Sequence, residues 1–597
     1  MVITRFSVPR ANLLLLFLLG CGSAALPTAA LPAPCSPAAW AAVPASSRSP
    51  SSASLELRLR PLPADTGGVV AVSVVVVAAE ARLSALRLPI GLRQPLKLRV
   101  TRERPGCDPA TGRSPLEQSE LQGAPGSLVA LGAASSSAQP VRLQVDYQLE
   151  LGETPGSAIH LDRDRFLAEG RQLFALPEGL DDAGAQTLVA IDASAYGPDG
   201  RAVSSLGLGT ERRGRMTRHA IEEAIFAAGY LGFAKFDAAE GQDEMAWFGS
   251  PLFDPRPLAA EIASFRSAVR EQLRDSSGIP LTSILSTELS LNGFEVRRAP
   301  ASIMVRVAPD QVLSAQLRLS ILHQVLKEWI GGRLSVVEQS GAEAVWFTEG
   351  WCRYLARELA FQFGLLSPLE YLEEINTLLA IQAVLGQPAH GAACAAEAAT
   401  PGGAFSGCRN LLALARGALH AGQIDALLHA RGKSLLELIS RWLKSVGGPV
   451  TTVAWAAALE QDGGKPVSVL LEGFVRGAAI VPPSAAFGPC FMRISLRYSE
   501  SSLGFDYRLA DNAPASTLPP ARWIATQVAE GSPAYGAGLR EGTAIRAIDY
   551  VPYSVDRPIR VLLAEGQLLE YRGRIGKVDG VAWKRAAGVP DLRCLQR

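Results

Sequence analysis

The spacing of apolar residues changes twice along this chain of 597 residues, and these changes limit the folds that it can adopt. Between residues 55 and 255 the apolar residues form short runs or alternate with polar residues, as they do over Val141–Leu151. Alternation with a period of two is typical of half-buried strands. We therefore predict a mostly antiparallel β domain over residues 55–255, with one short helix near Arg218–Ala228.

The period becomes helical from Pro257 onward, where apolar residues recur every three or four positions. We predict a helical domain over residues 256–482, entered through a few strands. Strand-like runs return after Pro482-Pro483, so residues 490–597 are expected to form a compact third unit. The fold class is therefore α+β with several domains. The expected helices of the second domain are Gln311–Ile330, Ala344–Phe363, Pro368–Leu385, Arg409–His429 and Ser434–Val446.

Composition excludes several classes of protein. Hydrophobic residues make up 48% of the chain and charged residues 19%, which is incompatible with a disordered or coiled-coil chain. Lys and Arg number 58 against 57 Asp and Glu, so no net field attracts nucleic acid or an anionic surface. We therefore expect no nucleic-acid partner.

The N-terminal segment indicates export. Arg5 and Arg10 precede a short apolar core, Leu13–Leu19, and small residues follow, as in a secretory signal peptide. The run Leu18–Cys21 resembles a bacterial lipobox, in which Cys21 is lipidated and becomes the mature N-terminus. The alternative is a plain signal peptide that is cleaved a few residues later.

We assign residues 1–21 to the signal and residues 22–54, rich in Pro, Ala and Ser, to a flexible tether. The Val-rich run Val69–Ala79 is too short for a membrane span and is predicted to be a buried strand. Any membrane attachment would therefore come from the N-terminal lipid. The expected location is the periplasm or the cell envelope.

Exported proteins can retain disulfide bonds, and seven cysteines remain besides Cys21. Cys352 lies in an apolar helical stretch and is expected to be a buried free thiol. Sequence alone does not prove any connectivity. The pairs suggested by the units that the cysteines bracket are Cys35–Cys107, Cys394–Cys408 and Cys490–Cys594.

Residues typical of a peptidase occur in the helical domain, but two of them are altered. A zinc peptidase of the H-E-x-x-H class needs two His at positions i and i+4 of a helix, with a Glu beside the first as general base. In one large subgroup a Glu on a following helix is the third ligand. Here His323 is followed by Gln324, its i+4 partner is Lys327, and Glu349 lies 22 residues beyond Lys327.

These residues and their surroundings resemble the glycyl aminopeptidase family of metallopeptidases. The matching segments are His323…Trp329, Trp346–Gly350 (WFTEG) and Gly364–Leu372 (GLLSPLEYL). The resemblance extends from about residue 55 to 597. It implies an N-terminal β domain, a thermolysin-like helical domain and a C-terminal PDZ domain. It also places Glu295, in the segment Asn292–Glu295, at the site for the substrate amine, although Glu295 could equally pair with Arg297 or Arg298.

The departures from the family motif make hydrolysis improbable. Gln324 lacks the basicity to take a proton from a metal-bound water. Lys327 is an ammonium ion near neutral pH and has no lone pair for zinc. His323 and Glu349 would then be vestigial ligands, and we expect no cofactor and a degenerate, non-hydrolytic member of the family. The alternative is an active zinc-dependent aminopeptidase with an altered site.

Lys327 also suggests a replacement for the metal. We hypothesise that a Lys327–Glu349 ion pair neutralises the carboxylate that zinc would otherwise bind. Removing one partner of a buried pair would cost on the order of 3–5 kcal/mol. Tightly bound stoichiometric zinc would contradict the hypothesis.

The C-terminal unit carries a second candidate site. Ser502–Phe505 resembles the carboxylate-binding loop of PDZ domains, and Glu530–Gly542 resembles the G-S-P-A-x-x-A-G-L-x-x-G stretch of bacterial PDZ domains. The resemblance implies that Leu503, Gly504 and Phe505 bind a peptide or a protein C-terminus, which adds to the sheet as a strand. The alternatives are a spacer with an empty groove and an envelope assembly or quality-control factor that acts through this domain.

Overall fold

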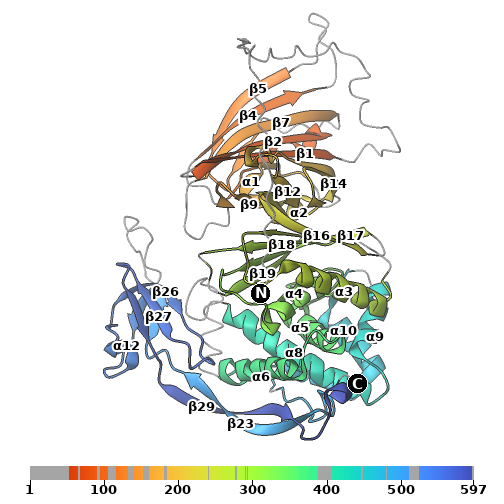
Figure 1. Ribbon diagram of the computed structural model, residues 1–597, viewed down its shortest axis with the longest axis vertical. Helices are drawn as coiled ribbons and strands as arrows, with labels where there is room; N and C mark the ends of the chain where they lie inside the picture. Colours follow the sequence, from red (N-terminus) through yellow and green to blue (C-terminus); the bar gives the residue numbers. More distant parts are fainter. Residues whose placement is uncertain are drawn as a thin grey trace, which may run out of the picture.

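The computed structural model describes residues 53–64, 67–90, 95–104, 116–131, 139–151, 160–180, 184–238, 241–275, 279–289, 291, 293–387, 407–445, 448–478, 480–509 and 523–594. Strands occupy one end of an elongated molecule and helices the other, and a smaller β unit lies beside the helices (Figure 1). The predicted β-rich N-terminal region and helical region are confirmed. Cys21, the signal and nearly all of the tether lie outside the described residues.

The N-terminal region is built on a seven-stranded sheet with the order β14-β11-β1-β2-β7-β4-β5. All neighbours are antiparallel except β1 and β11. Burial in β7 follows the alternation from which this strand was predicted: Val141, Leu143 and Val145 are buried, and the residues between them are more exposed. The strands are β1 (Ser54–Ala64), β2 (Gly67–Ala79), β4 (Leu96–Glu103), β5 (Leu116–Gly123), β7 (Pro140–Leu151), β11 (Ala185–Ile191) and β14 (Glu211–Met216).

Smaller elements complete this region. A three-stranded sheet covers part of the core, and a five-stranded sheet, β13-β12-β15-β9-β8, lies towards the helical region. The bounds are β3 (Ala85–Arg87), β6 (Leu128–Ala130), β10 (Leu176–Pro177), β8 (His160–Leu161), β9 (Arg165–Glu169), β12 (Arg201–Ser204), β13 (Gly207–Leu208), β15 (Ile225–Gly229), α1 (Gly170–Leu173), α2 (Arg218–Glu223), η2 (Glu80–Arg82) and η3 (Ser194–Tyr196).

The helix predicted over Arg218–Ala228 is too long. Helix α2 ends at Glu223, and Ile225–Gly229 form β15, which pairs with β9 and β12. Every residue of β15 is buried. A fully buried strand is a continuous apolar run, which periodicity alone does not distinguish from a helix.

A second five-stranded sheet, with the order β16-β17-β18-β20-β19, lies between the N-terminal region and the helices. β16 and β17 precede residue 256, so this sheet crosses the boundary predicted at 255/256. β19 is an edge strand of the sheet. The strands are β16 (Leu231–Ala238), β17 (Gly241–Phe248), β18 (Thr282–Thr287), β19 (Phe294–Ala299) and β20 (Ser302–Val307).

Five helical segments occur close to their predicted positions, whereas α10 and α11 fall in a part of the helical region for which no helix was predicted. None of the helices in the described part of the chain combines the length and the apolar composition that crossing a bilayer requires. A short parallel pair, β21 and β22, lies among them. The elements are α3 (Pro255–Leu273), α4 (Ala315–Leu326), β21 (Leu334–Val337), the π-helical turn η4 (Trp346–Trp351), α5 (Cys352–Gln362), α6 (Pro368–Leu385), α8 (Cys408–His429), α9 (Leu435–Ser445), β22 (Gly448–Thr451), α10 (Thr452–Gly463) and α11 (Lys465–Val475).

The C-terminal unit is joined to the helices by a long antiparallel ribbon of β23 (Phe491–Ser501) and β29 (Ile575–Arg585), which runs along α6 (Figure 1). Asn376 of α6 exchanges two hydrogen bonds of 2.9 Å with the backbone of Trp583. The ribbon carries a five-stranded antiparallel sheet. Its elements are β24 (Asp506–Leu509), β25 (Trp523–Thr526), α12 (Pro533–Gly536), β26 (Ala544–Asp549), β27 (Ile559–Leu563) and β28 (Leu568–Tyr571), and α13 (Asp591–Cys594) follows β29.

Two cysteine predictions are confirmed. Cys490 and Cys594 form a disulfide that joins the residue before β23 to the end of α13. Cys352 is a buried free thiol. The other two predicted pairs involve Cys35, Cys107 and Cys394, which lie outside the described residues.

Candidate functional site

Helix α4 places His323 and Lys327 one turn apart. The helix begins after Ser314, whose hydroxyl accepts a hydrogen bond from the N–H of Leu317. It ends at Leu326, and the N–H of Lys327 donates to the carbonyl of His323 over 3.2 Å. Residues four apart lie on one face of a helix, so the two side chains can reach the same point.

Glu349 is held by the π-helical turn η4. The other five residues of η4 are buried, whereas Glu349 is only half-buried. η4 packs so closely on α8 that a Cβ on Gly350 would lie 2.6 Å from the Cα of Gly417, and one on Gly417 would lie 2.1 Å from the carbonyl oxygen of Trp346. Glycine at both positions therefore lets the two backbones meet and fixes Glu349 opposite α4.

The structure brings His323, Lys327 and Glu349 together. Lys327 Nζ donates to Glu349 Oε1 over 2.5 Å, and His323 Nε2 lies 3.5 Å from Glu349 Oε2. The predicted ion pair is thus present, but it is not fully buried: 22% of the Lys327 side chain and 28% of the Glu349 side chain are exposed. We call these three residues the α4–η4 cluster.

The environment of His323 favours the neutral form of its imidazole. Burial lowers its pKa well below the ordinary value, and the positive charges of Arg353 and Lys327 lower it further. Its Nε2 is buried and has no hydrogen-bond partner among the described residues. Cys352 lies beside it, with Sγ 3.6 Å from the His323 carbonyl oxygen, and burial raises the pKa of this thiol.

The residues of the α4–η4 cluster do not fit a catalytic zinc ion. The unpartnered Nε2 of His323 and the Glu349 carboxylate are two suitable donors, whereas catalytic zinc usually has three protein ligands. The third position holds the ammonium group of Lys327, which repels a metal ion. Within the described ranges no group of three or more His, Cys, Asp or Glu side chains is arranged to hold one.

Gln324 and Glu295 lie outside this cluster. Gln324 is half-buried on α4, and its carbonyl accepts a hydrogen bond of 3.0 Å from Arg298 Nη1. Glu295 is on β19, where successive side chains point to opposite faces. Val296 packs against the helical core, but Glu295 points to the other face and is bound by Arg306 Nη1 at 2.8 Å. It pairs with neither Arg297 nor Arg298, and the structure does not bring it next to His323.

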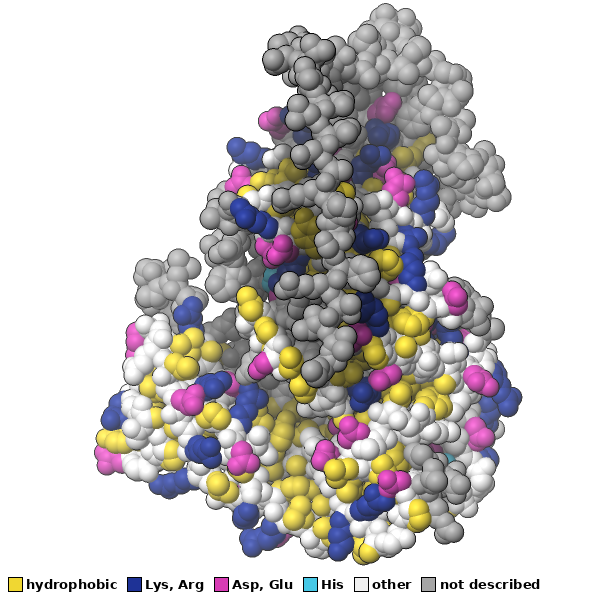
Figure 2. Space-filling view, viewed as in Figure 1, with side chains coloured by type: hydrophobic (Ala, Val, Ile, Leu, Met, Phe, Trp, Pro, Cys, Tyr) yellow, Lys and Arg dark blue, Asp and Glu magenta, His cyan; other side chains and the backbone are white. Residues whose placement is uncertain are grey.

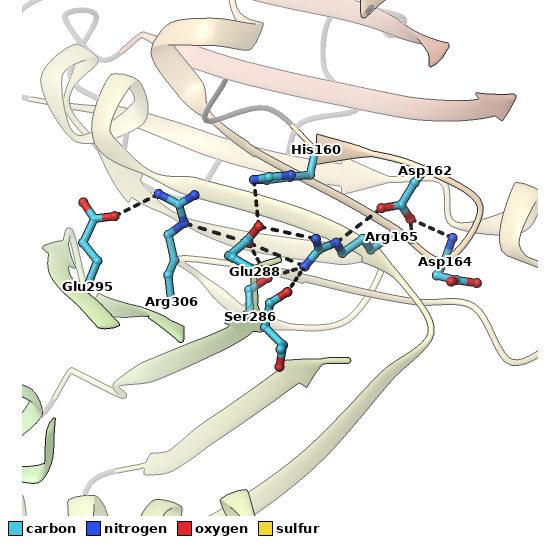
Figure 3. A network of polar contacts seen from close by, with 9 residues as sticks. His160, Asp162, Asp164, Arg165, Ser286, Glu288, Glu295 and Arg306 are labelled. Atoms are coloured by element: carbon cyan, nitrogen blue, oxygen red, sulfur yellow. Dashed lines mark hydrogen bonds and ion pairs between the residues drawn. The ribbon is translucent and has the colours of Figure 1, made fainter. Parts of the chain in front are cut away.

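A second charged cluster surrounds Glu288, just beyond β18 (Figure 3). We call it the Glu288 cluster. The Glu288 carboxylate accepts from Ser286 Oγ at 2.7 Å and lies 3.4 Å from Arg165 Nη2 and 3.3 Å from His160 Nε2. Arg306 Nε is 3.9 Å away. Since His160 and Arg165 belong to the N-terminal region, this cluster joins it to the sheet that supports the helices.

Sequence reasoning did not find the Glu288 cluster. Its members come from β8, β9, β18 and β20, and no motif or fixed spacing connects them. The pKa of His160 is lowered, chiefly by burial and then by Arg165 and Arg306, although Glu288 opposes this shift.

The candidate peptide-binding loop lies at the start of β24, an edge strand of the C-terminal sheet. Gly504 has φ +83°, a conformation that side chains rarely adopt. Leu503 and Phe505 are buried, and the Leu503 carbonyl accepts a hydrogen bond from Tyr571 Oη over 2.7 Å. The loop is therefore held firmly from within the unit.

The order of the sheets and helices gives this chain a fold that is shared with a solved protein of the aminopeptidase N family. The chain is similar to the aminopeptidase N family protein from Idiomarina loihiensis, with 15% identity and a TM-score of 0.60 over 90% of this chain and 99% of that chain. A weaker similarity, to the M1 zinc metallopeptidase from Deinococcus radiodurans, has 13% identity and a TM-score of 0.42 over 72% of this chain and 95% of that one.

At these identities the likeness is one of fold alone. The expected architecture, a β-rich N-terminal region followed by a helical region, is shared with the aminopeptidase N family protein. The likeness to glycyl aminopeptidases and the PDZ assignment remain predictions. No known family model matches the sequence, and no curated protein shows significant similarity to it.

Proposed function

We propose that this chain is an exported protein that binds peptides on a metallopeptidase fold without hydrolysing them. One observation carries the proposal: Lys327 Nζ lies 2.5 Å from Glu349 Oε1, so a protein cation stands where a metal would need that oxygen. The amide of Gln324 adds no general base. Under this proposal the ion pair keeps Glu349 neutralised and preserves the shape of the site.

The edge strand β19 supports the binding role. Among the described strands only β20 pairs with β19, so its outer edge presents backbone N–H and C=O groups. α4 packs beside it, and the Arg298–Gln324 bond connects the two. An extended peptide can add to such an edge through main-chain hydrogen bonds. We propose that the bound peptide lies along β19, beside the α4–η4 cluster.

The C-terminal unit supplies a second peptide site in this proposal. Its β24 is also an edge strand, and the Leu503–Phe505 loop precedes it. The N–H groups of Gly504 and Phe505 form no backbone hydrogen bond with the described part of the chain, whereas the backbone of Leu503 is hydrogen-bonded to Tyr550. We propose that they bind the carboxylate of a protein C-terminus, as in a PDZ domain. A peptide with a free C-terminus should then bind more tightly than its amidated copy.

The alternative function is an active zinc-dependent aminopeptidase with an altered site. It is favoured by His323 Nε2, a buried atom without a hydrogen-bond partner among the described residues, 3.5 Å from Glu349 Oε2. Metal analysis and peptide hydrolysis, on the wild type and on the double variant Gln324→Glu plus Lys327→His, separate the two functions. Zinc uptake only in the variant supports the proposal, and chelator-sensitive activity of the wild type overturns it.

The face of the molecule in Figure 2 carries Lys and Arg side chains interspersed with Asp and Glu over its described part. Mixed charge of this kind favours no polyanion, so the proposed partners are peptides and protein C-termini, not nucleic acid. Export and a lipid on Cys21 complete the proposal. A mass increase of the N-terminal fragment equal to a lipid anchor tests the latter.

A further inference from the structure

A small pocket lies between the N-terminal region and the outer strands of the sheet that supports the helices. Its volume is about 240 Å³, and apolar side chains of β9, β15 and β20 form part of its lining. Its charged lining consists of Glu169, Arg171, Glu295, Arg297 and Arg306. Pockets for whole drug-sized ligands are usually larger, about 300–1,000 Å³. This pocket is smaller than that range and has room for a whole side chain.

The pocket contains more hydrogen-bond donors than acceptors. Arg297 and Arg171 share Glu169, at 2.8 Å and 2.7 Å, and Arg306 binds Glu295 at 2.8 Å. Three guanidinium groups thus face two carboxylates. Each guanidinium carries five N–H donors and no acceptor. Spare donors and one net positive charge remain for a ligand.

The charges behind the pocket do not reverse this balance. Arg306 also lies 3.9 Å from Glu288, but Glu288 is itself bound by Arg165 (Figure 3). Arg165 also contacts Asp162, whose side chain is half exposed to water, so these three groups together carry one net negative charge. None of the three lines the pocket, whose own lining keeps the excess of guanidinium groups. His160, which also contacts Glu288, has a lowered pKa. An anionic group is therefore favoured over a cationic or apolar one, which would leave the spare N–H donors of the guanidinium groups without acceptors.

The pocket opens where a peptide on β19 would direct half of its side chains. Glu295 and Arg297 point to the same face of β19, towards β9, and line the pocket. In a strand added to β19, every second side chain points to that face. We infer that the pocket binds the carboxylate of an acidic side chain, Asp or Glu, of a peptide bound along β19. This inference rests on the proposed function and adds its specificity.

Three synthetic decapeptides with blocked ends, alike except for a central Glu, Gln or Lys, test the inference. Their dissociation constants for the full chain are measured by fluorescence anisotropy. We expect the Glu peptide to bind about tenfold more tightly than the Gln peptide, because a carboxylate forms charge-assisted hydrogen bonds with arginine. The Lys peptide should bind most weakly.

Arg297→Gln should reduce the preference for Glu over Gln to less than about threefold. Arg171→Gln, at a more exposed position, keeps the test valid if the first variant does not fold. Arg497→Gln, which removes an exposed arginine from β23, is the matched control and should keep the preference. Equal binding of the Glu and Gln peptides to the wild type contradicts the proposed role of the pocket but not peptide binding on β19. No binding of any of the three overturns peptide binding on β19 as well.

Discussion

Two clusters of similar composition differ in what surrounds them. The α4–η4 cluster and the Glu288 cluster each combine a carboxylate, a histidine and a cation. The Glu288 side chain is 2% exposed and is held by residues from two regions of the chain, whereas the Glu349 side chain is 28% exposed and has one close cation. The first arrangement stabilises the junction between regions. The second leaves a carboxylate near solvent, as a site for a ligand requires.

The largest expected effect comes from removing the buried carboxylate. Glu288→Ala leaves Arg165 and Arg306 without their shared partner, so the free energy of unfolding should fall by about 3–5 kcal/mol. Urea denaturation measures it. Glu295→Ala removes a half-exposed partner of the same Arg306 and should cost at most about 1 kcal/mol. Equal losses in the two variants would mean that burial does not distinguish these carboxylates.

The histidines of the two clusters should respond differently to acid. Both have folded-state pKa values below the ordinary one, but His323 lies well below it, while Glu288 limits the shift of His160. The unfolded chain therefore takes up protons first, and stability that is present above about pH 6.5 is lost as the pH falls.

Replacing His323 by Gln should remove more of this loss than replacing His160 by Gln. The free energy of unfolding of the His323→Gln variant, relative to that of the wild type, should be about 2 kcal/mol higher at pH 5 than at pH 8. This value follows because one pKa unit corresponds to about 1.4 kcal/mol. Denaturation at the two pH values measures it. His219→Gln, at an exposed position, is the control. NMR titration should find His160 protonated at a higher pH than His323, and the reverse order would contradict the comparison.

The smallest effect is expected for the ion pair of the α4–η4 cluster. Lys327→Met should lower the free energy of unfolding by about 1 kcal/mol, less than the value for a buried pair, because both side chains remain partly hydrated. A double-mutant cycle with Glu349→Gln measures the coupling. Lys97→Met, on the exposed face of β4, is the control. A loss above about 3 kcal/mol would place this pair in the same class as Glu288.

Local signals in the sequence predict the helices well. Helix α6 has the bounds predicted from its helical spacing, Pro368–Leu385, and the structure shows a capping box formed by Ser367 and Glu370 at its start. Helix α4 is shorter than predicted, since Ser314 caps it and Lys327 ends it. β15 was missed because its pairing with β9 and β12, which no local pattern records, determines its conformation.

The candidate site was predictable only where local sequence signals define it. His323 and Lys327 are one helical turn apart, and Glu349 was found through a motif, so these three residues could be placed together from sequence. The Glu288 cluster could not, because its members meet only after several strands have packed. The direction of Glu295 depends on which face of β19 meets α4, which strand alternation alone does not determine.

The bond between Cys490 and Cys594, which are 104 positions apart in the sequence, closes a covalent loop that contains every strand of the C-terminal unit. A protease that cuts once inside this loop would leave both fragments attached, and they would separate on a gel only after reduction. In a reducing compartment, the ribbon of β23 and β29 would depend on strand pairing and on its contacts with α6. The covalent continuity of this unit is therefore tied to the place where the protein matures.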